Sequence, residues 1–247
     1  MPDSFDHGPP PAWERVFAQA PLDFYQQHPR FRTEFCPVYY RGRLDGTARV
    51  LVIGQDPSTD EILAQRNLVG SAGQLVQGLL GKLGITHSYA MFNTFLYGIR
   101  GQFDTTMRNL AAGDPILAFR NTILDQAAAE NQLEAIIAFG NGAHRTVDSW
   151  PGGQQLPVFK LIHPTARQGI AESWNQHLPQ MLATIQPDAG AAPNPALYGP
   201  ALTEQDQVNI PRFDLPFGIP DWHGTGGTRS TRGGSTTKIV WTSPDQS

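Results

Sequence analysis

Alternating stretches of apolar and polar residues divide the middle of the chain into short strands and longer helices. Four apolar runs bounded by turn residues predict buried strands at residues 49–53, 89–95, 133–139 and 157–162. Segments with helical periodicity or helix-end signals lie after them and predict helices at residues 71–84, 114–130, 141–150 and 172–185. Strands that alternate with helices predict an α/β fold with a mostly parallel sheet of four strands.

Residues that favour helix ends indicate where two of these helices begin or end. Ser71 is expected to be the N-cap of the first helix, and Gly84 its C-cap. Pro115 is expected at the first position of the second helix. Pro179 lies inside the last predicted helix and is expected to kink or interrupt it.

The composition of the two ends differs from that of the middle, which predicts three parts. Residues 1–22 begin with a Pro-rich stretch and are expected to form an N-terminal arm, whereas residues 23–187 form the α/β domain. Residues 188–247 are rich in Pro and Gly and are expected to form an extended strap with a flexible tail, the alternative being a disordered tail throughout. The strap is favoured because this part carries apolar side chains that need a surface to cover: Phe213, Leu215, Phe217, Ile219 and Trp222.

Polar residues follow each predicted strand, where a parallel sheet places its ligand crevice. Residues 54–58 read Gly-Gln-Asp-Pro-Ser, and Asn93 lies near the end of the second strand. Residues 140–142 read Gly-Asn-Gly, and residues 163–165 read His-Pro-Thr. We therefore expect these polar groups to gather on one rim of the sheet.

Three of these side chains have chemistry suited to a reaction, although each also has an ordinary structural interpretation. The carboxylate of Asp56 can act as a base or stabilise a cation, or it can close an Asx turn. A neutral His163 can donate a hydrogen bond to a developing anion, or bond to the backbone. The carboxamide of Asn93 can match the edge of a nucleobase, or satisfy a turn. Their shared rim favours a functional site.

The composition excludes several classes of function. The chain has no apolar run of about 18 residues, so we expect no membrane span. The start of the chain lacks the basic and apolar stretches of a signal peptide, so we expect a cytoplasmic protein of bacterial type. The single cysteine, Cys36, excludes an internal disulfide framework and any zinc or iron–sulfur site built on four cysteines.

The net charge of −4 argues against a protein that coats nucleic acid by bulk charge. A local cationic rim around a small site is compatible with that net charge. The last part of the chain, residues 223–238, holds cations and no acidic residue, so it could follow a DNA backbone or be a solvated tail. The cations considered for the rim or for this last part are Arg66, Arg167, Arg229, Arg232 and Lys238.

The ordered motifs together resemble the uracil-DNA glycosylase superfamily. Residues 54–57 carry the Gly-Gln-Asp-Pro signature of its main family, and residues 163–165 resemble the closing His-Pro-Ser motif. Residues 66–75, Arg-Asn-Leu-Val-Gly-Ser-Ala-Gly-Gln-Leu, are similar to a segment of the iron–sulfur uracil-DNA glycosylases. Residues 92–94 are similar to the strand that supplies the uracil-reading Asn, and residues 136–143 to a strand-to-helix turn of the superfamily.

The resemblance implies a three-layer α/β/α fold and a monomeric enzyme without cofactor or metal. Its partner would be single- or double-stranded DNA of the nucleoid, from which it would flip and excise uracil. Asp56 would stabilise the cationic sugar and position water, and His163 would hydrogen-bond uracil O2. Asn93 would read the O4/N3 edge and reject cytosine, and the backbone amide of Gln55 would stabilise the anion. The remaining implied contacts are base stacking at Leu68 and phosphate binding by Ser58, Ser71, Thr165 and Arg167.

The sequence also departs from both families. Ser58 stands where the main family has a Tyr that blocks the thymine methyl group, and Leu68 stands where the iron–sulfur family has a stacking Phe. Arg167 replaces the Leu that wedges into the base stack, and it could fill the gap, bind phosphate or be a solvated loop residue. The cysteines that would hold an iron–sulfur cluster are absent. We therefore expect a branch outside these two families.

Three alternatives stay open. A glycosylase for hypoxanthine or xanthine is less favoured, because such relatives tend to lack the catalytic Asp that Asp56 would supply. A Rossmann-like module that binds a nucleotide is less favoured, because residues 54–57 are not a dinucleotide fingerprint. The third alternative is a reader that holds damaged DNA without turnover.

Overall fold

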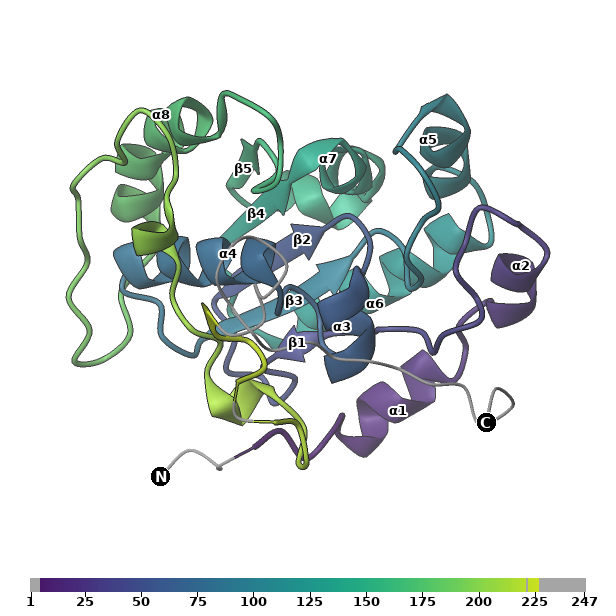
Figure 1. Cartoon of the computed structure of the whole chain (residues 1–247). Coiled ribbons are helices and arrows are strands. Elements are labelled where there is room, and N and C mark those ends of the chain that lie inside the picture. The colour runs from purple at the N-terminus through teal and green to yellow at the C-terminus, as the bar shows by residue number, and fades with distance from the viewer. Residues whose placement is uncertain (1–4, 221, 227–247) are drawn as a thin grey trace, which may run out of the picture.

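A computed structural model describes residues 5–220 and 222–226, and its centre is a five-stranded sheet (Figure 1). The strand order is β1-β3-β2-β4-β5, with β2 to β5 parallel and β1 antiparallel at the edge. The α/β fold with a mostly parallel sheet is confirmed, and a two-residue edge strand joins the four that were predicted. The strands are β1 (Arg41–Gly42), β2 (Val50–Gly54), β3 (Tyr89–Asn93), β4 (Ala135–Phe139) and β5 (Val158–Leu161).

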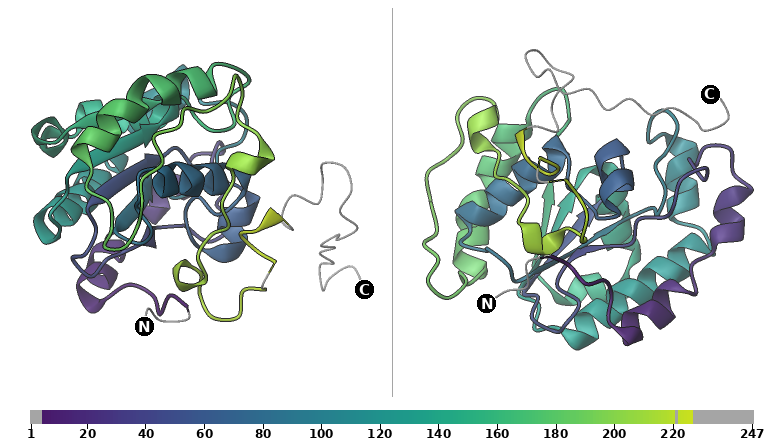
Figure 2. Two further views of the ribbon diagram at one scale, coloured as in Figure 1. Left: turned by 90° about the vertical axis from the view of Figure 1, so that its left-hand side faces the viewer. Right: turned by 60° about the horizontal axis from the view of Figure 1, so that its bottom comes forward.

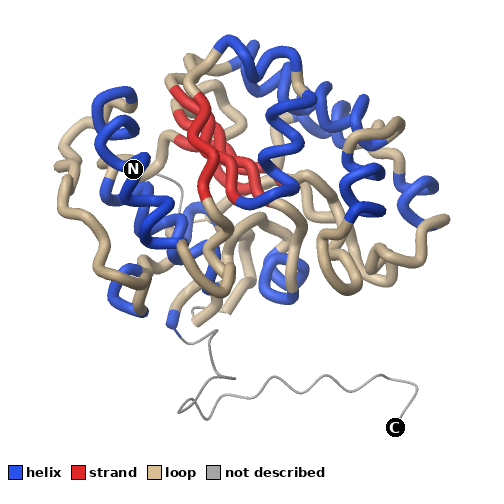
Figure 3. Tube along the Cα trace, turned by 90° about the horizontal axis from the view of Figure 1, so that it is seen from above, coloured by secondary structure: helices blue, strands red, loops and turns tan. Residues whose placement is uncertain are grey.

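Helices cover both faces of the sheet, which gives three layers (Figure 3). Successive residues of a strand point to opposite faces. Leu51 and Ile53 therefore pack on the face covered by α1 (Pro11–Phe17), α2 (Leu22–Gln26), α5 (Thr105–Ala111), α6 (Ile116–Glu130) and α7 (Gly140–Ser149). Val50 and Val52 pack on the other face, against α4 (Ser71–Lys82) and α8 (Ile170–Thr184). The short α3 (Thr59–Ala64) follows β2.

The helix ends differ from the predictions by small shifts. Gly70 is the N-cap of α4 and Ser71 is its first residue, because Gly70 has the extended backbone that a cap needs. Leu83 is the C-cap, and Gly84 follows it with φ +74°. Pro115 is the N-cap of α6 and not its first residue. The last predicted helix, α8, continues through Pro179, which lies on an exposed part of the helix.

The N-terminal residues pack on the core through α1. The Trp13 ring stacks on Phe92 of β3 with ring centroids 5.6 Å apart, and its Nε1 donates to Glu130 Oε2 at 2.7 Å. Trp13 is buried. The arm predicted for residues 1–22 therefore includes a helix that shares the core of the α/β domain.

Residues 187–220 and 222–226 form a strap that runs over α4 (Figure 2). The strap includes the short 3-10 helices η2 (Glu204–Asp206) and η3 (Arg212–Asp214), and a third, η1 (Pro151–Gln155), follows α7. Backbone bonds from Asn194 to Lys82 and from Val208 to Gln74 tie the strap to α4. Among its predicted covering residues, Leu215 is buried whereas Phe217 is 82% exposed. Arg229, Arg232 and Lys238 lie outside the described residues.

Two buried carboxylates anchor the strap to the amino ends of the strands. Asp214 accepts hydrogen bonds from Arg43 Nη2 at 2.7 Å and from the Tyr89 hydroxyl at 2.6 Å. Asp188 accepts from Arg49 Nη2 at 2.5 Å, from the Ser88 hydroxyl and from backbone amides. Each carboxylate thus replaces its lost hydration with hydrogen bonds from groups of the sheet and the loops beside it.

Asp188→Asn is expected to lower the free energy of unfolding by about 1.5–3 kcal/mol, the range for a hydrogen bond to a charged group. Burial alone would raise the pKa of Asp188, but bonds from Ser88, the His87 amide and Arg49 hold it well below its usual range. The stabilisation is therefore present above the unfolded pKa of about 4 and is lost as pH falls toward the folded value. Urea unfolding at pH 7 and pH 3 measures this, and the difference between wild type and variant should shrink at pH 3.

The exposed pair of Asp148 and Lys160 supplies the control. Because both side chains of this pair are exposed, Asp148→Asn should change the free energy of unfolding by less than about 1 kcal/mol. An Asp188→Asn protein as stable as this control at pH 7 would contradict the anchoring role.

Candidate functional site

The carboxyl ends of the parallel strands bring the predicted polar residues to one edge of the sheet. Gly54 at the end of β2 pairs with Asn93 at the end of β3, and Asp56 follows two residues later. Phe139 at the end of β4 pairs with Leu161 of β5, so residues 140–142 and His163 follow on neighbouring strands. The structure therefore places these groups at the edge where the sequence predicted a rim.

Asp56 is held in place by two donors. Its Oδ2 accepts from the Ile99 amide at 3.0 Å, and its Oδ1 accepts from Gln55 Nε2 at 3.0 Å. Burial raises the pKa of Asp56, and these two bonds oppose the rise. The exposed Arg32 also opposes it through its charge. The site thus contains an oriented, partly buried carboxylate, which suits it to interact with a nearby positive charge.

His163 is held as a neutral hydrogen-bond donor. The Thr165 amide donates to His163 Nδ1 at 3.3 Å, and the Thr165 hydroxyl lies 2.9 Å from the same atom. A backbone N–H can only donate, so Nδ1 is the acceptor and Nε2 carries the hydrogen of the neutral ring. Burial lowers the pKa of His163, which keeps the ring neutral at pH 7. Gly140, with φ +83°, leaves room for it, because a Cβ there would lie 3.0 Å from the His163 Cβ.

Asn93 presents the oxygen of its side-chain amide at this edge of the sheet. The residue is 8% exposed, and its Nδ2 donates to Asn67 Oδ1 at 2.9 Å. Within the described residues its buried Oδ1 accepts no hydrogen bond. A Cβ on Gly54 would overlap this oxygen, so the glycine of the 54–57 motif is required by the close approach of the Asn93 side chain.

Leu68 lies beside Gly54 and Asn93, in the segment that leads into α4. Its Cδ1 is 3.8 Å from the position that a Cβ on Gly54 would take, and its backbone has φ +53°. The Leu68 carbonyl rests against Gly73 of α4, where a Cβ would overlap it. The close packing of the segment on the first turn of α4 therefore depends on glycine at position 73.

Glu61 connects these parts, and the sequence analysis missed it. The buried carboxylate accepts from the Val69 and Gly70 amides at 3.0 Å each, which holds the Leu68 segment against α3. It also accepts from the Ser58 amide at 3.0 Å and from the Ser58 hydroxyl, which forms a capping box. The spacing Ser-x-x-Glu at residues 58–61 is the sequence signal that could have identified it.

The charge of Glu61 acts on both proposed catalytic side chains. It raises the pKa of Asp56 further, and it opposes the lowering of the His163 pKa by burial. Both groups therefore lie within electrostatic reach of the same carboxylate. Because the Ser58 hydroxyl donates to Glu61, its hydrogen is already used, and phosphate binding by Ser58 stays a prediction.

The other predicted residues lie around this edge. The side chain of Gln55 packs against residue 142, where a Cβ would lie 2.8 Å from Gln55 Cγ and 3.2 Å from Phe103 Cε2. Phe103 is thus an aromatic ring beside the site that the sequence analysis did not select. The residues predicted to contact phosphate that are exposed here are Ser58, Ser71, Thr165 and Arg167.

Arg66 was considered for the cationic rim in the sequence analysis, and the structure shows that this prediction is wrong. It is 7% exposed, its Nε donates to Asp6 Oδ2 at 2.7 Å, and its guanidinium lies 4.6 Å from the centre of the Tyr40 ring. Its charge is therefore already paired within the protein. Arg32, which is exposed and close enough to affect Asp56, lies at the site edge instead.

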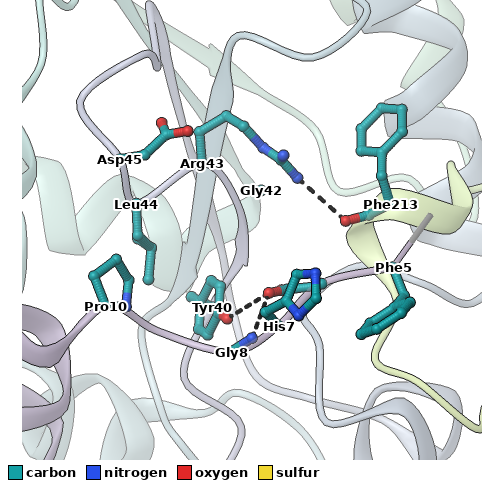
Figure 4. Close-up of a pocket in the computed structure, with 11 residues that line it drawn as sticks. Phe5, His7, Gly8, Pro10, Tyr40, Gly42, Arg43, Leu44, Asp45 and Phe213 are labelled. Carbon is teal, nitrogen blue, oxygen red and sulfur yellow. Dashed lines mark hydrogen bonds between the residues drawn. The ribbon is translucent and has the colours of Figure 1, made fainter. Parts of the chain in front are cut away.

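A separate cavity of about 150 Å³ lies along the edge strand β1 (Figure 4). It is lined by the N-terminal segment, by Tyr40 and residues 42–45, and by Phe213 of the strap. Arg43 Nη2 approaches the Phe213 carbonyl oxygen at 3.4 Å across it. The cavity marks the seam between these three segments and contains none of the strand-end residues.

The described residues, 5–220 and 222–226, were compared with the requirements of a metal site and of a membrane-spanning helix, and they meet neither. They contain no cluster of three or more His, Cys, Asp and Glu side chains arranged to hold a metal ion. No helix in the same ranges has both the length and the apolar character needed to cross a membrane.

Comparison with known protein families gives one match. Residues 42–186, more than half of the 247 residues, match the Uracil DNA glycosylase superfamily. The matched region begins in β1 and ends just after α8, so it contains the sheet and every strand-end residue described above. No curated protein matches the chain.

Proposed function

The chain belongs to the uracil-DNA glycosylase superfamily, and on that premise we propose that it removes uracil from DNA by hydrolysing the N-glycosidic bond. Membership supports a glycosylase-type function that acts on DNA, and the choice of uracil is the proposed part. The observation that carries it is that one edge of the sheet holds both an oriented, partly buried carboxylate, Asp56, and the Asn93 amide oxygen, which has no partner among the described residues.

Asp56 would act on the sugar. As the bond between base and sugar lengthens, positive charge develops on the sugar ring, and a fixed carboxylate in a site with little water stabilises that charge strongly. The same carboxylate can orient the attacking water and accept its proton. The Ile99 amide and Gln55 hold Asp56 in one position, so little reorganisation is needed during the reaction.

His163 would act on the departing base. Negative charge builds on uracil O2 as the bond breaks, and the neutral ring can donate its Nε2 hydrogen to that oxygen. The lowered pKa of His163 supports this role, because a neutral imidazole can donate a hydrogen bond to the anion and keep its own proton. The Thr165 amide donates to Nδ1, which supports the tautomer that carries its hydrogen on Nε2.

Asn93 would select the base. Its Oδ1 can accept the N3 hydrogen of uracil, and the second hydrogen of its Nδ2 can be donated to O4. Cytosine has an acceptor at N3 and a donor at its 4-amino group, so binding it would leave buried polar groups unpaired. Leu68 would lie against the base, and the exposed Ser71, Thr165 and Arg167 are proposed to contact the DNA backbone.

The test is base release from labelled oligonucleotides that carry one uracil, one hypoxanthine or one thymine mismatch, in single and double strands. We expect an abasic site only from the uracil substrates, with many turnovers per enzyme. Release of hypoxanthine without uracil would replace the proposed substrate. Tight binding without release from any substrate would contradict the enzymatic proposal.

A further inference from the structure

Asn67 is a buried amide whose orientation is fixed by the backbone. It has no exposed surface, and its Nδ2 donates to the Tyr39 carbonyl at 3.1 Å and to the Met91 carbonyl at 3.4 Å. Carbonyl oxygens can only accept hydrogen bonds, so the nitrogen of the Asn67 amide must face them. Its Oδ1 must therefore point the other way.

That oxygen in turn fixes the amide of Asn93. Asn67 Oδ1 can only accept, so the group that faces it at 2.9 Å must be the Asn93 Nδ2. The Asn93 Oδ1 is consequently turned away from Asn67 and toward Gly54, where it has no partner among the described residues. The two orientations of an isolated carboxamide have nearly the same shape, so this chain of bonds is what distinguishes them.

We propose that Asn67 is a positioning residue that sets which base the site accepts, by holding the Asn93 amide in the orientation that matches uracil. The inference rests on the proposed function. In the fixed orientation Asn93 offers an acceptor and one N–H, which complements the N3–H and O4 of uracil. After a flip it would offer the reversed pair, which complements N3 and the 4-amino group of cytosine. Asn67 therefore opposes the flip that would admit cytosine.

Asn67→Leu tests the proposal, because Leu is similar in size and removes both the donor and the acceptor. The measurement is kcat/KM for uracil and for cytosine in the same oligonucleotide. We expect the preference for uracil over cytosine to fall at least about tenfold, the factor of a neutral hydrogen bond at the upper end of its range. An unchanged preference would overturn the positioning role.

Asn131 offers a matched control far from the site. It is also a buried Asn with two backbone bonds, from its Nδ2 to the Ala127 carbonyl at 2.9 Å and from the Ala48 amide to its Oδ1 at 2.8 Å. Asn131→Leu should lose stability as Asn67→Leu does, but keep the preference for uracil. An equal change of preference in both variants would show a general effect of lost stability and would contradict the proposal.

Two further measurements separate this inference from the proposed function. In an Asn93→Ala background, Asn67→Leu should change the base preference no further, and fully additive effects would contradict the coupling. In the free protein, NMR should show hydrogen exchange of the Asn93 side-chain NH2 to be at least about tenfold faster in Asn67→Leu, the factor of one lost hydrogen bond. If the wild type releases no uracil, the proposed function fails, and this exchange rate alone decides whether Asn67 holds Asn93.

Discussion

Asp56→Asn is expected to lower the rate of uracil release by about 10²- to 10⁴-fold, the range for a positioned acid–base or electrostatic group. The variant should fold normally, because Asn can still accept from the Ile99 amide and can donate to Gln55 after that side chain turns its amide. The substitution removes the charge that is proposed to stabilise the cationic sugar and to take the proton of water. Single-turnover release of labelled uracil measures the effect, and binding of the uracil oligonucleotide should stay near that of wild type.

The pH dependence and the stability of this variant give independent checks. The proposed reaction needs Asp56 ionised and His163 neutral, so wild-type release should rise with pH through the raised pKa of Asp56 and then level off. The folded protein holds the Asp56 proton more tightly than the unfolded chain, so its ionisation at pH 7 opposes folding. Asp56→Asn should therefore have a Tm no lower than wild type. Wild-type turnover in this variant would remove Asp56 from the mechanism.

Gly73→Ala is expected to lower uracil release by about 10²-fold, the effect of displacing a reacting group by about 1 Å. The new Cβ would overlap the Leu68 carbonyl, which is backbone and cannot turn aside as a side chain can. The segment that carries Leu68 must shift, and with it the contact to Gly54 and Asn93. The free energy of unfolding should also fall, by about 1–3 kcal/mol as in other overpacked sites.

Gly81→Ala in the same helix is the matched control. Gly81 is exposed, and a Cβ there meets no other atom within 4 Å. Alanine at an open helix position should raise stability by up to about 1 kcal/mol and leave activity unchanged. Both variants should be assayed well below their melting temperatures, so that only folded protein is compared. If Gly73→Ala kept the activity of the control, Leu68 would not form part of the site.

The sequence predicts the central sheet well because each core strand is a short apolar run with a turn residue after it. Those runs also predict where the candidate site lies, because the residues that follow parallel strands share one edge of the sheet. The edge strand β1 was missed, because the two residues Arg41 and Gly42 carry no apolar pattern. Arg41 is nevertheless fully buried, since it contacts Met91 and forms an ion pair with Asp214 of the strap 3.7 Å away.

Long-range partners account for what the sequence could not predict at the site. From the sequence alone Arg66 is a candidate for DNA contact, but in the structure it is paired with Asp6, which lies sixty residues earlier in the chain. Glu61 and Asn67 act through bonds to backbone groups of other segments, and such bonds leave no spacing to detect apart from the capping box of Glu61. The roles of Asp56, His163 and Asn93 remain predictions, although their position at one edge follows from the topology.

The two sides of the site differ in how firmly they are held, and the strap supports only one of them. The Leu68 wall is fixed from both sides, by Glu61 within the domain and by strap residues Ile210 and Leu215, which pack against Val69 behind it. The loop of residues 164–169, which follows His163, is mostly exposed, and exposed segments of this kind are the ones that open most easily. Mutational tolerance should divide accordingly. The fold should tolerate substitutions at residues 164–169, whereas substitutions behind Leu68 should displace the side chain that is proposed to lie against the base.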